Sequence, residues 1–259
     1  MAEANGLYYE EHGSGPPLIL SAGLGGSGGY WAPNLTALAE HRRVIAYDHR
    51  GTGRSDPAIP NPTSIDDMAR DVIALMDGVD IDRADLMGHA LGGIIGLALA
   101  RLAPERLNKL VVINGWAKTE PFTLRCFDAR LHILNAGGPQ AYLQAQPIFL
   151  FPAAWIAKNG DRLARETEVH AAHFQGEVKL MKRIAAIETF DASEWIGSLT
   201  TPTLALASRD DMLVPYTASE NLAAANDNIS LSLMPWGGHA CNVTDPDTFN
   251  RIVLDFLRS

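Results

Sequence analysis

Short apolar runs alternate with helical patterns along the first half of the chain, and this alternation constrains the fold more than any other feature. The apolar runs have the length and the Val, Ile and Leu content of β-strands. They are residues 18–21, 44–47, 84–87 and 110–113. Most are apolar at consecutive positions, which is typical of parallel strands covered on both faces. Residues 65–78 and 91–102 lie between them and carry apolar side chains at helical spacing. The pattern predicts βαβ units and an α/β fold with a mostly parallel, doubly wound sheet.

The alternation stops after Trp116. From about residue 118 to residue 189 the pattern is helical only, with breaks at Gly137-Gly-Pro139 and at Pro152. We therefore expect an α/β core interrupted by an inserted helical cap of residues 117–189.

The predicted core consists of residues 1–116 and 190–259. Strand patterns return at residues 203–207 and 229–234, and a last helix is expected after Pro246. Residues 7–10 are expected to add an antiparallel edge strand.

Composition excludes several classes of protein. The 30 acidic and 21 basic residues give a net charge of −9, which argues against a nucleic-acid partner because such binding rests on clustered Lys and Arg. Two cysteines make no disulfide framework. The first residues lack the pattern of a signal peptide, and the longest apolar stretch, residues 91–102, is too short to span a bilayer. We expect a cytoplasmic protein with no membrane partner, present as a monomer or a homodimer.

The segment Gly88-His-Ala-Leu-Gly92 lies between a predicted strand and a predicted helix. It has the glycine spacing of the G-x-S-x-G nucleophile elbow, in which the turn is sharp and the backbone crowded. Alanine stands at the serine position, as Ala90. An ordinary strand-to-helix turn would also contain such glycines, but Gly93 and the preceding buried strand favour an elbow.

Three further segments follow predicted strands. Ser21-Ala-Gly-Leu-Gly-Gly26 would present backbone N–H groups to an oxyanion, and it lacks the endings of phosphate-binding and dinucleotide-binding loops. An acidic residue of Asp210-Asp-Met-Leu-Val-Pro215 would orient a histidine, and Gly237-Gly-His239 follows the last strand. The chain order elbow, acid, histidine is the order of α/β-hydrolases. We predict that the oxyanion donors are the N–H groups of Leu24 and Leu91.

With these residues the chain resembles the α/β-hydrolase family from end to end. Asp48-His-Arg-Gly-Thr-Gly-Arg-Ser55 matches the D-x-R-G-x-G-x-S region, and the spacing from Asp211 to Pro215 matches the family's acid loop, which selects Asp211 over Asp210. Four shorter segments are similar to the pyrimidine-utilisation protein D family. They are residues 113–116, 144–147, 173–176 and 237–246.

This narrower resemblance implies a hydrolase of uracil breakdown in the Rut pathway, acting on a carbon–nitrogen bond of carbamate or, alternatively, of aminoacrylate. The resemblance also favours Ala90 as the natural residue, although an engineered replacement of serine remains an alternative. In that case the chain would be a conventional ester or amide hydrolase. A binding protein that has lost catalysis is a third hypothesis, which the retained Asp211 and His239 disfavour.

Carbamate decomposition needs no nucleophile, because protonation of its nitrogen releases ammonia and carbon dioxide. We expect His239 to carry that proton and Asp211 to stabilise the imidazolium. Cys241 is a weaker candidate for a substitute nucleophile, and Cys126 is expected to serve in packing. No His, Cys or Asp cluster has the spacing of metal ligands, so we expect no metal and no cofactor.

The small anionic substrates that the resemblance implies need a positive charge in a closed site. Arg125, at the start of the predicted cap, is a candidate partner for the carboxylate because a guanidinium donates two parallel hydrogen bonds. A surface position for Arg125 is the alternative. Trp116 is expected to line the same pocket.

Overall fold

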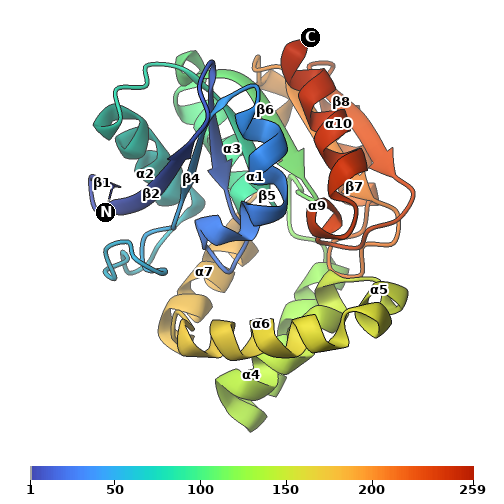
Figure 1. The fold of residues 1–259 in the computed structure, drawn as a ribbon. Helices are drawn as coiled ribbons and strands as arrows, with labels where there is room; N and C mark the ends of the chain where they lie inside the picture. The colour runs from blue at the N-terminus through green and yellow to red at the C-terminus, as the bar shows by residue number, and fades with distance from the viewer. Residues whose placement is uncertain (1) are drawn as a thin grey trace.

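A computed structural model describes residues 2–259. Its centre is an eight-stranded sheet in the order β1-β2-β4-β3-β5-β6-β7-β8 (Figure 1). The strands are β1 (Glu3–Ala4), β2 (Leu7–His12), β3 (Pro17–Ser21), β4 (Arg43–Tyr47), β5 (Ala84–His89), β6 (Leu107–Ile113), β7 (Thr203–Ser208) and β8 (Ile229–Met234). All pairs from β4 to β8 are parallel, whereas β2 pairs antiparallel with β4. The predicted α/β-hydrolase class and its mostly parallel sheet are confirmed.

The predicted edge strand at residues 7–10 exists and is antiparallel, but it is not the outermost strand. The two-residue strand β1 pairs with it through Glu3 opposite Tyr8 and Ala4 opposite Leu7. This pairing escapes sequence analysis because two residues carry no periodicity.

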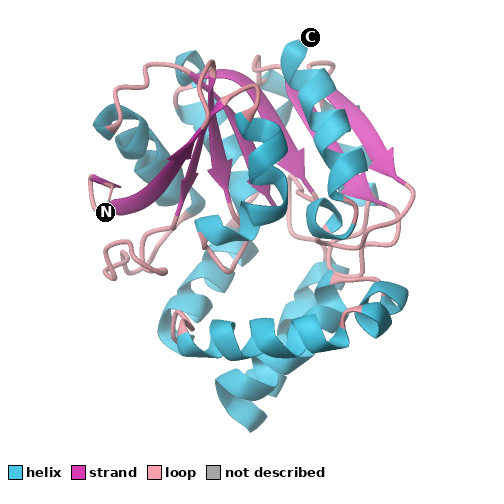
Figure 2. Ribbon diagram, in the orientation of Figure 1, coloured by secondary structure: helices cyan, strands magenta, loops and turns pink. Residues whose placement is uncertain are grey.

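Helices cover both faces of the sheet, as Figure 2 shows. On one face, α2 (Ile65–Gly78), α3 (Leu91–Leu102) and α8 (Thr217–Ala225) contribute to one large apolar cluster. On the other, α1 (Ala32–Ala39), α9 (Cys241–Thr244) and α10 (Pro246–Arg258) contribute to a second cluster. The bounds of α2 and α3 agree with the predicted ranges. At the start of α2 the Ser64 and Asp67 side chains each accept a hydrogen bond from the other's backbone N–H, which is a capping box.

Four helices follow β6 with no strand between them: α4 (Pro121–Leu150), α5 (Ala153–Lys158), α6 (Gly160–Ala172) and α7 (Glu177–Thr189). The predicted break at residues 137–139 is a kink inside α4, where Gly138 has a φ of 70°. The predicted break at Pro152 separates α4 from α5. In Figures 1 and 2 the arrowheads of the parallel strands point toward α4, α5 and α6.

The segment that we predicted as the cap leaves and rejoins the core at adjacent points. Lys118 forms an isolated antiparallel bridge with Asp191, and their side chains form an ion pair of 2.6 Å. The N–H of Ala192 also donates to the carbonyl of Ala117. The division of the chain into a core (residues 1–116 and 190–259) and a cap (residues 117–189) stays a prediction. Among residues 2–259, no helix is long and apolar enough to cross a bilayer.

Candidate active site

The turn between β5 and α3 has the backbone of a nucleophile elbow. Ala90 lies there with φ 48° and ψ −106°, a conformation that costs a residue with a side chain of the order of 1–3 kcal/mol. Its N–H donates to the carbonyl of Ile113 at 2.8 Å, which ties the turn to the end of β6. A Cβ on Gly88 would collide with the Gly92 backbone, and one on Gly92 would collide with the Ser21 backbone. Both glycines of the motif are therefore required by close backbone packing.

The loop after β3 (residues 22–27, called here the oxyanion loop) lies beside the elbow, because Ser21 pairs with Gly88 across the two strands. Leu91 is the first residue of α3, so its N–H has no partner within the helix. Within residues 2–259, neither the Leu24 nor the Leu91 N–H donates a hydrogen bond to another protein group. The role of both amides as oxyanion donors stays a prediction.

Asp211 and His239 meet across 28 residues of chain. His239 Nδ1 lies 2.8 Å from Asp211 Oδ2, and the side chains of both residues are buried. The other carboxylate oxygen of Asp211 accepts from the N–H groups of Leu213 and Val214 at 2.7 and 2.9 Å. The carboxylate is thus fixed by its own loop (residues 209–216, the acid loop), and it holds the imidazole with Nδ1 as the protonated nitrogen.

Asp210 has a different environment. Its Oδ1 accepts from the Ser208 hydroxyl at 2.6 Å and from the Gly238 N–H at 2.9 Å. The residue therefore links the acid loop to the loop that carries the histidine (residues 235–240, the His loop). The family spacing that selected Asp211 as the partner of His239 agrees with this geometry.

Two side chains donate hydrogen bonds to the main chain of His239. Its carbonyl accepts from Asn114 Nδ2 at 2.6 Å and from His89 Nε2 at 2.7 Å. Because a carbonyl only accepts, the Nε2 atom of His89 carries the proton. Burial, together with the nearby His239, lowers the pKa of His89 well below its ordinary value, so His89 is neutral. Sequence analysis did not assign either residue, although His89 lies inside the elbow motif.

Arg125 does not have the buried position expected of a carboxylate partner in a closed site. It is exposed, because the buried stripe of α4 passes through Thr123, Cys126, Phe127 and Arg130 at helical spacing and Arg125 falls outside it. The arginine that α4 buries is Arg130, which is 5% exposed. Trp116 is 2% exposed within the main apolar cluster, and its indole nitrogen has no partner in the described chain. Its role in lining a substrate pocket stays a prediction.

Arg183 of α7 is a second buried arginine that the sequence analysis missed. It is 1% exposed and donates to the carbonyl of Leu24, to the carbonyl of Arg50 and to the Gln175 side chain. It thereby ties α7 to the oxyanion loop and to the loop after β4. No motif marks it, because charged residues recur throughout α7.

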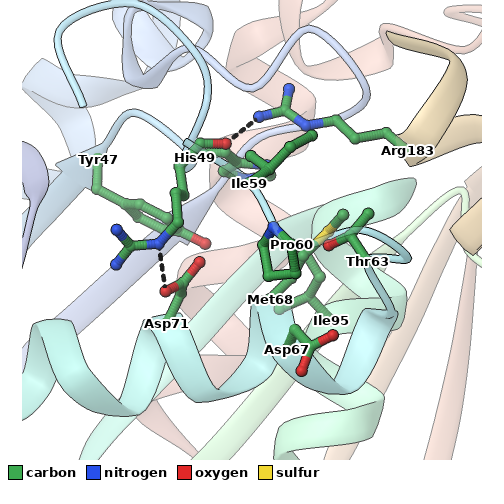
Figure 3. Close-up of a pocket in the computed structure, with 11 residues that line it drawn as sticks. Tyr47, His49, Ile59, Pro60, Thr63, Asp67, Met68, Asp71, Ile95 and Arg183 are labelled. Carbon is green, nitrogen blue, oxygen red and sulfur yellow. Dashed lines mark hydrogen bonds and ion pairs between the residues drawn. The ribbon is translucent and has the colours of Figure 1, made fainter. Parts of the chain in front are cut away.

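A small cavity of about 20 Å³ lies beside Arg183, lined by Tyr47, His49, Asp71 and others drawn in Figure 3. That volume holds one water molecule and is too small for a substrate. Burial, and secondarily Arg183, lowers the pKa of His49 to about 3, so this histidine is neutral. The cavity is therefore not a candidate for the substrate site.

Neither cysteine has the character of a substitute nucleophile. Burial, with the nearby Asp211 carboxylate, raises the pKa of Cys241 to about 12, which keeps it a thiol at neutral pH. Cys126 is buried and its thiol faces the carbonyl of Met212 at 3.6 Å. Within the described residues, no three His, Cys, Asp or Glu side chains are grouped to hold a metal ion.

Comparison with known proteins identifies the family. The model of the alpha/beta hydrolase fold matches residues 16–143. The protein of Pseudomonas syringae pv. syringae (strain B728a) named "Putative carbamate hydrolase RutD" is 51% identical over 95% of both chains. A protein of the same name from Rhizobium rhizogenes (strain K84) is 46% identical over 98% of both. The chain is an α/β-hydrolase of the RutD family.

Two solved structures agree with the assignment of the chain to the α/β-hydrolase fold. The enol-lactonase from Burkholderia xenovorans LB400 superposes with a TM-score of 0.89 at 27% identity, over 100% of this chain and 99% of that one. A hydrolase from Pseudomonas aeruginosa PA01 gives 0.87 at 29% identity, over 98% and 94%. As a member of this family the chain is a hydrolase.

Proposed function

We propose that this protein promotes the breakdown of carbamate to ammonia and carbon dioxide in pyrimidine catabolism, with His239 as the proton donor. The observation that carries the proposal is the Asp211–His239 pair at 2.8 Å beside an elbow where Ala90 offers only a methyl group. Covalent catalysis at the elbow needs a nucleophile. Acid–base catalysis needs only a positioned proton donor.

The reaction proceeds in two steps. His239 Nε2 transfers its proton to the nitrogen of carbamate, and the carbon–nitrogen bond then breaks with its electron pair going to nitrogen. Ammonia and carbon dioxide leave, and the imidazole takes up a proton from solvent. The Asp211 carboxylate favours the imidazolium before transfer, and the Leu24 and Leu91 amides bind a carboxylate oxygen of the substrate.

Aminoacrylate is the second candidate, since the same donor would protonate its carbon and water would then replace the nitrogen to give malonic semialdehyde and ammonia. The names of the two relatives described above mention carbamate, which supports carbamate as the first candidate.

The test is a stopped-flow assay of carbon dioxide release from ammonium carbamate at several pH values near neutrality, each compared with the rate without protein at the same pH. The wild-type protein is expected to accelerate release, and His239→Ala is expected to remove the acceleration. His170→Ala, on an exposed cap helix, is the matched control and should behave as wild type. Equal rates with wild-type protein and with no protein would reject carbamate, and the same comparison with aminoacrylate would then decide the second candidate.

A further inference from the structure

Arg130 is a buried cation with incomplete bonding. Its Nη2 donates to the Tyr142 hydroxyl at 2.6 Å. Its Nε is shielded from solvent and has no partner among the described residues, and no carboxylate there lies within 4.0 Å of the guanidinium. The rings of Phe127, Tyr142 and Phe149 surround it at 5.0–5.9 Å. A buried positive charge without an anion is costly, so this arrangement is expected to bind one.

Helix α4 carries Arg130, Phe127, Tyr142 and Phe149 (called here the aromatic cluster), and it contacts two loops of the candidate site. Before the kink, Thr123 and Cys126 contact the acid loop through the carbonyls of Leu213 and Met212. After the kink, the carbonyl of Leu150 accepts from the N–H of Ala240 in the His loop. In the sequence, Phe127 directly follows Cys126, and Phe149 directly precedes Leu150. Arg130 therefore belongs to the helix that contacts both the acid loop and the His loop, and its guanidinium lies among rings from both parts of that helix.

The pKa of Cys126 responds to charges in both the aromatic cluster and the acid loop. Burial raises it, the nearby Arg130 opposes that rise, and the nearby Asp211 adds to it. The Cys126 thiol is therefore close to both the Arg130 guanidinium and the Asp211 carboxylate, which orients His239.

The chemistry of the cluster suits a carboxylate. The guanidinium has unused N–H donors in one plane, and a planar carboxylate accepts two of them in parallel. Burial raises the pKa of Tyr142, so its hydroxyl keeps a proton that it can donate to the same anion. The aromatic rings exclude water and strengthen both interactions.

We propose that Arg130 and Tyr142 bind the carboxylate of the substrate together with the Leu24 and Leu91 amides, since each carboxylate oxygen can accept more than one hydrogen bond. The inference rests on the proposed function, because that function supplies a small substrate with one carboxylate next to the reacting group. It assigns to Arg130 the task that the sequence suggested for Arg125, five residues earlier on the same helix.

The test measures binding of acetate, a stable carboxylate that cannot react, by isothermal titration. Wild type and Arg125→Gln are expected to bind acetate equally, and Arg130→Gln is expected to bind it about tenfold or more weakly, which is the effect of losing one charge-assisted hydrogen bond. Tyr142→Phe should weaken binding by a smaller factor. Equal acetate affinity in Arg130→Gln and wild type would overturn the proposal.

Two further measurements separate the possible failures. Arg130→Lys keeps the charge and is the variant to use if Arg130→Gln does not fold, and it should retain part of the affinity. Kinetics with carbamate should show a higher KM and a nearly unchanged kcat in Arg130→Gln. If wild type binds acetate through Arg130 but does not accelerate carbamate breakdown, the carboxylate site stands and the proposed reaction fails.

Discussion

Nδ1 of His239 lies 2.8 Å from Oδ2 of Asp211, while the second oxygen of that carboxylate is held by the backbone N–H groups of Leu213 and Val214. The carboxylate is therefore fixed before any substrate binds, and the only ring nitrogen of His239 left for chemistry is Nε2.

This relationship predicts unequal losses on replacement. His239→Ala removes the proton donor and should abolish the acceleration of the reaction. Asp211→Asn keeps a hydrogen-bonding group at Nδ1 but loses the negative charge that stabilises the imidazolium, so we expect a reduction of roughly 10²-fold, within the range that acid–base catalysis contributes. Steady-state kinetics of both variants, with circular dichroism to verify folding, checks the order. A greater loss in Asp211→Asn than in His239→Ala would contradict it.

The elbow predicts a gain of function. Ala90→Ser would place a hydroxyl on a turn with φ 48°, ψ −106° and the glycine spacing of a nucleophile elbow. We expect the variant to react with 4-nitrophenyl acetate, giving a burst of nitrophenolate and a covalent acetyl group detectable by mass spectrometry. Combining Ala90→Ser with His239→Ala should remove the burst, because the serine then lacks its base. A folded Ala90→Ser protein that is never acylated would show that the elbow is not aligned with the histidine.

Arg183 predicts a coupling between α7 and the oxyanion loop. Arg183→Gln removes the donors to the Leu24 and Arg50 carbonyls, so we expect a loss of about 2–3 kcal/mol in the free energy of unfolding. We also expect KM to rise, because the Leu24 N–H that would bind the substrate carboxylate is no longer held in place. Urea denaturation and kinetics measure the two effects. Lys182→Gln, the adjacent and less buried position, is the control and should change neither.

His49 predicts a loss of stability in acid. Burial holds its pKa at about 3 in the folded protein, whereas an unfolded histidine titrates near 6.5. As the pH falls from about 6.5 toward 3, the unfolded chain takes up a proton that the folded protein refuses, so stability decreases by up to about 1.4 kcal/mol per pH unit. His89 acts in the same direction.

Urea denaturation between pH 7.5 and pH 4.5 tests this expectation. His49→Gln should flatten the dependence of the unfolding free energy on pH, while His170→Gln at an exposed position should leave it as in wild type. An unchanged slope in His49→Gln would show that other groups cause the acid sensitivity.

The sequence by itself determined the class of fold, the bounds of α2 and α3, and the chain order of the elbow, Asp211 and His239. These features are readable because each depends on local patterns: consecutive apolar residues in covered strands, a 3.6-residue period in helices, and glycines where the backbone is crowded. The kink of α4 was also readable, since Gly137-Gly-Pro139 interrupts a helix wherever it occurs.

Only the tertiary structure decided which arginines are buried. Arg125, Arg130 and Arg183 all lie in helices with mixed polar surfaces, and the sequence gives each the same charge and no distinguishing motif. Arg130 is buried because the packing of α4 on the acid and His loops fixes the rotation of that helix, and Arg183 is buried because α7 lies against a carbonyl 159 residues away. Such contacts join segments distant in sequence, so no pattern within one segment records them.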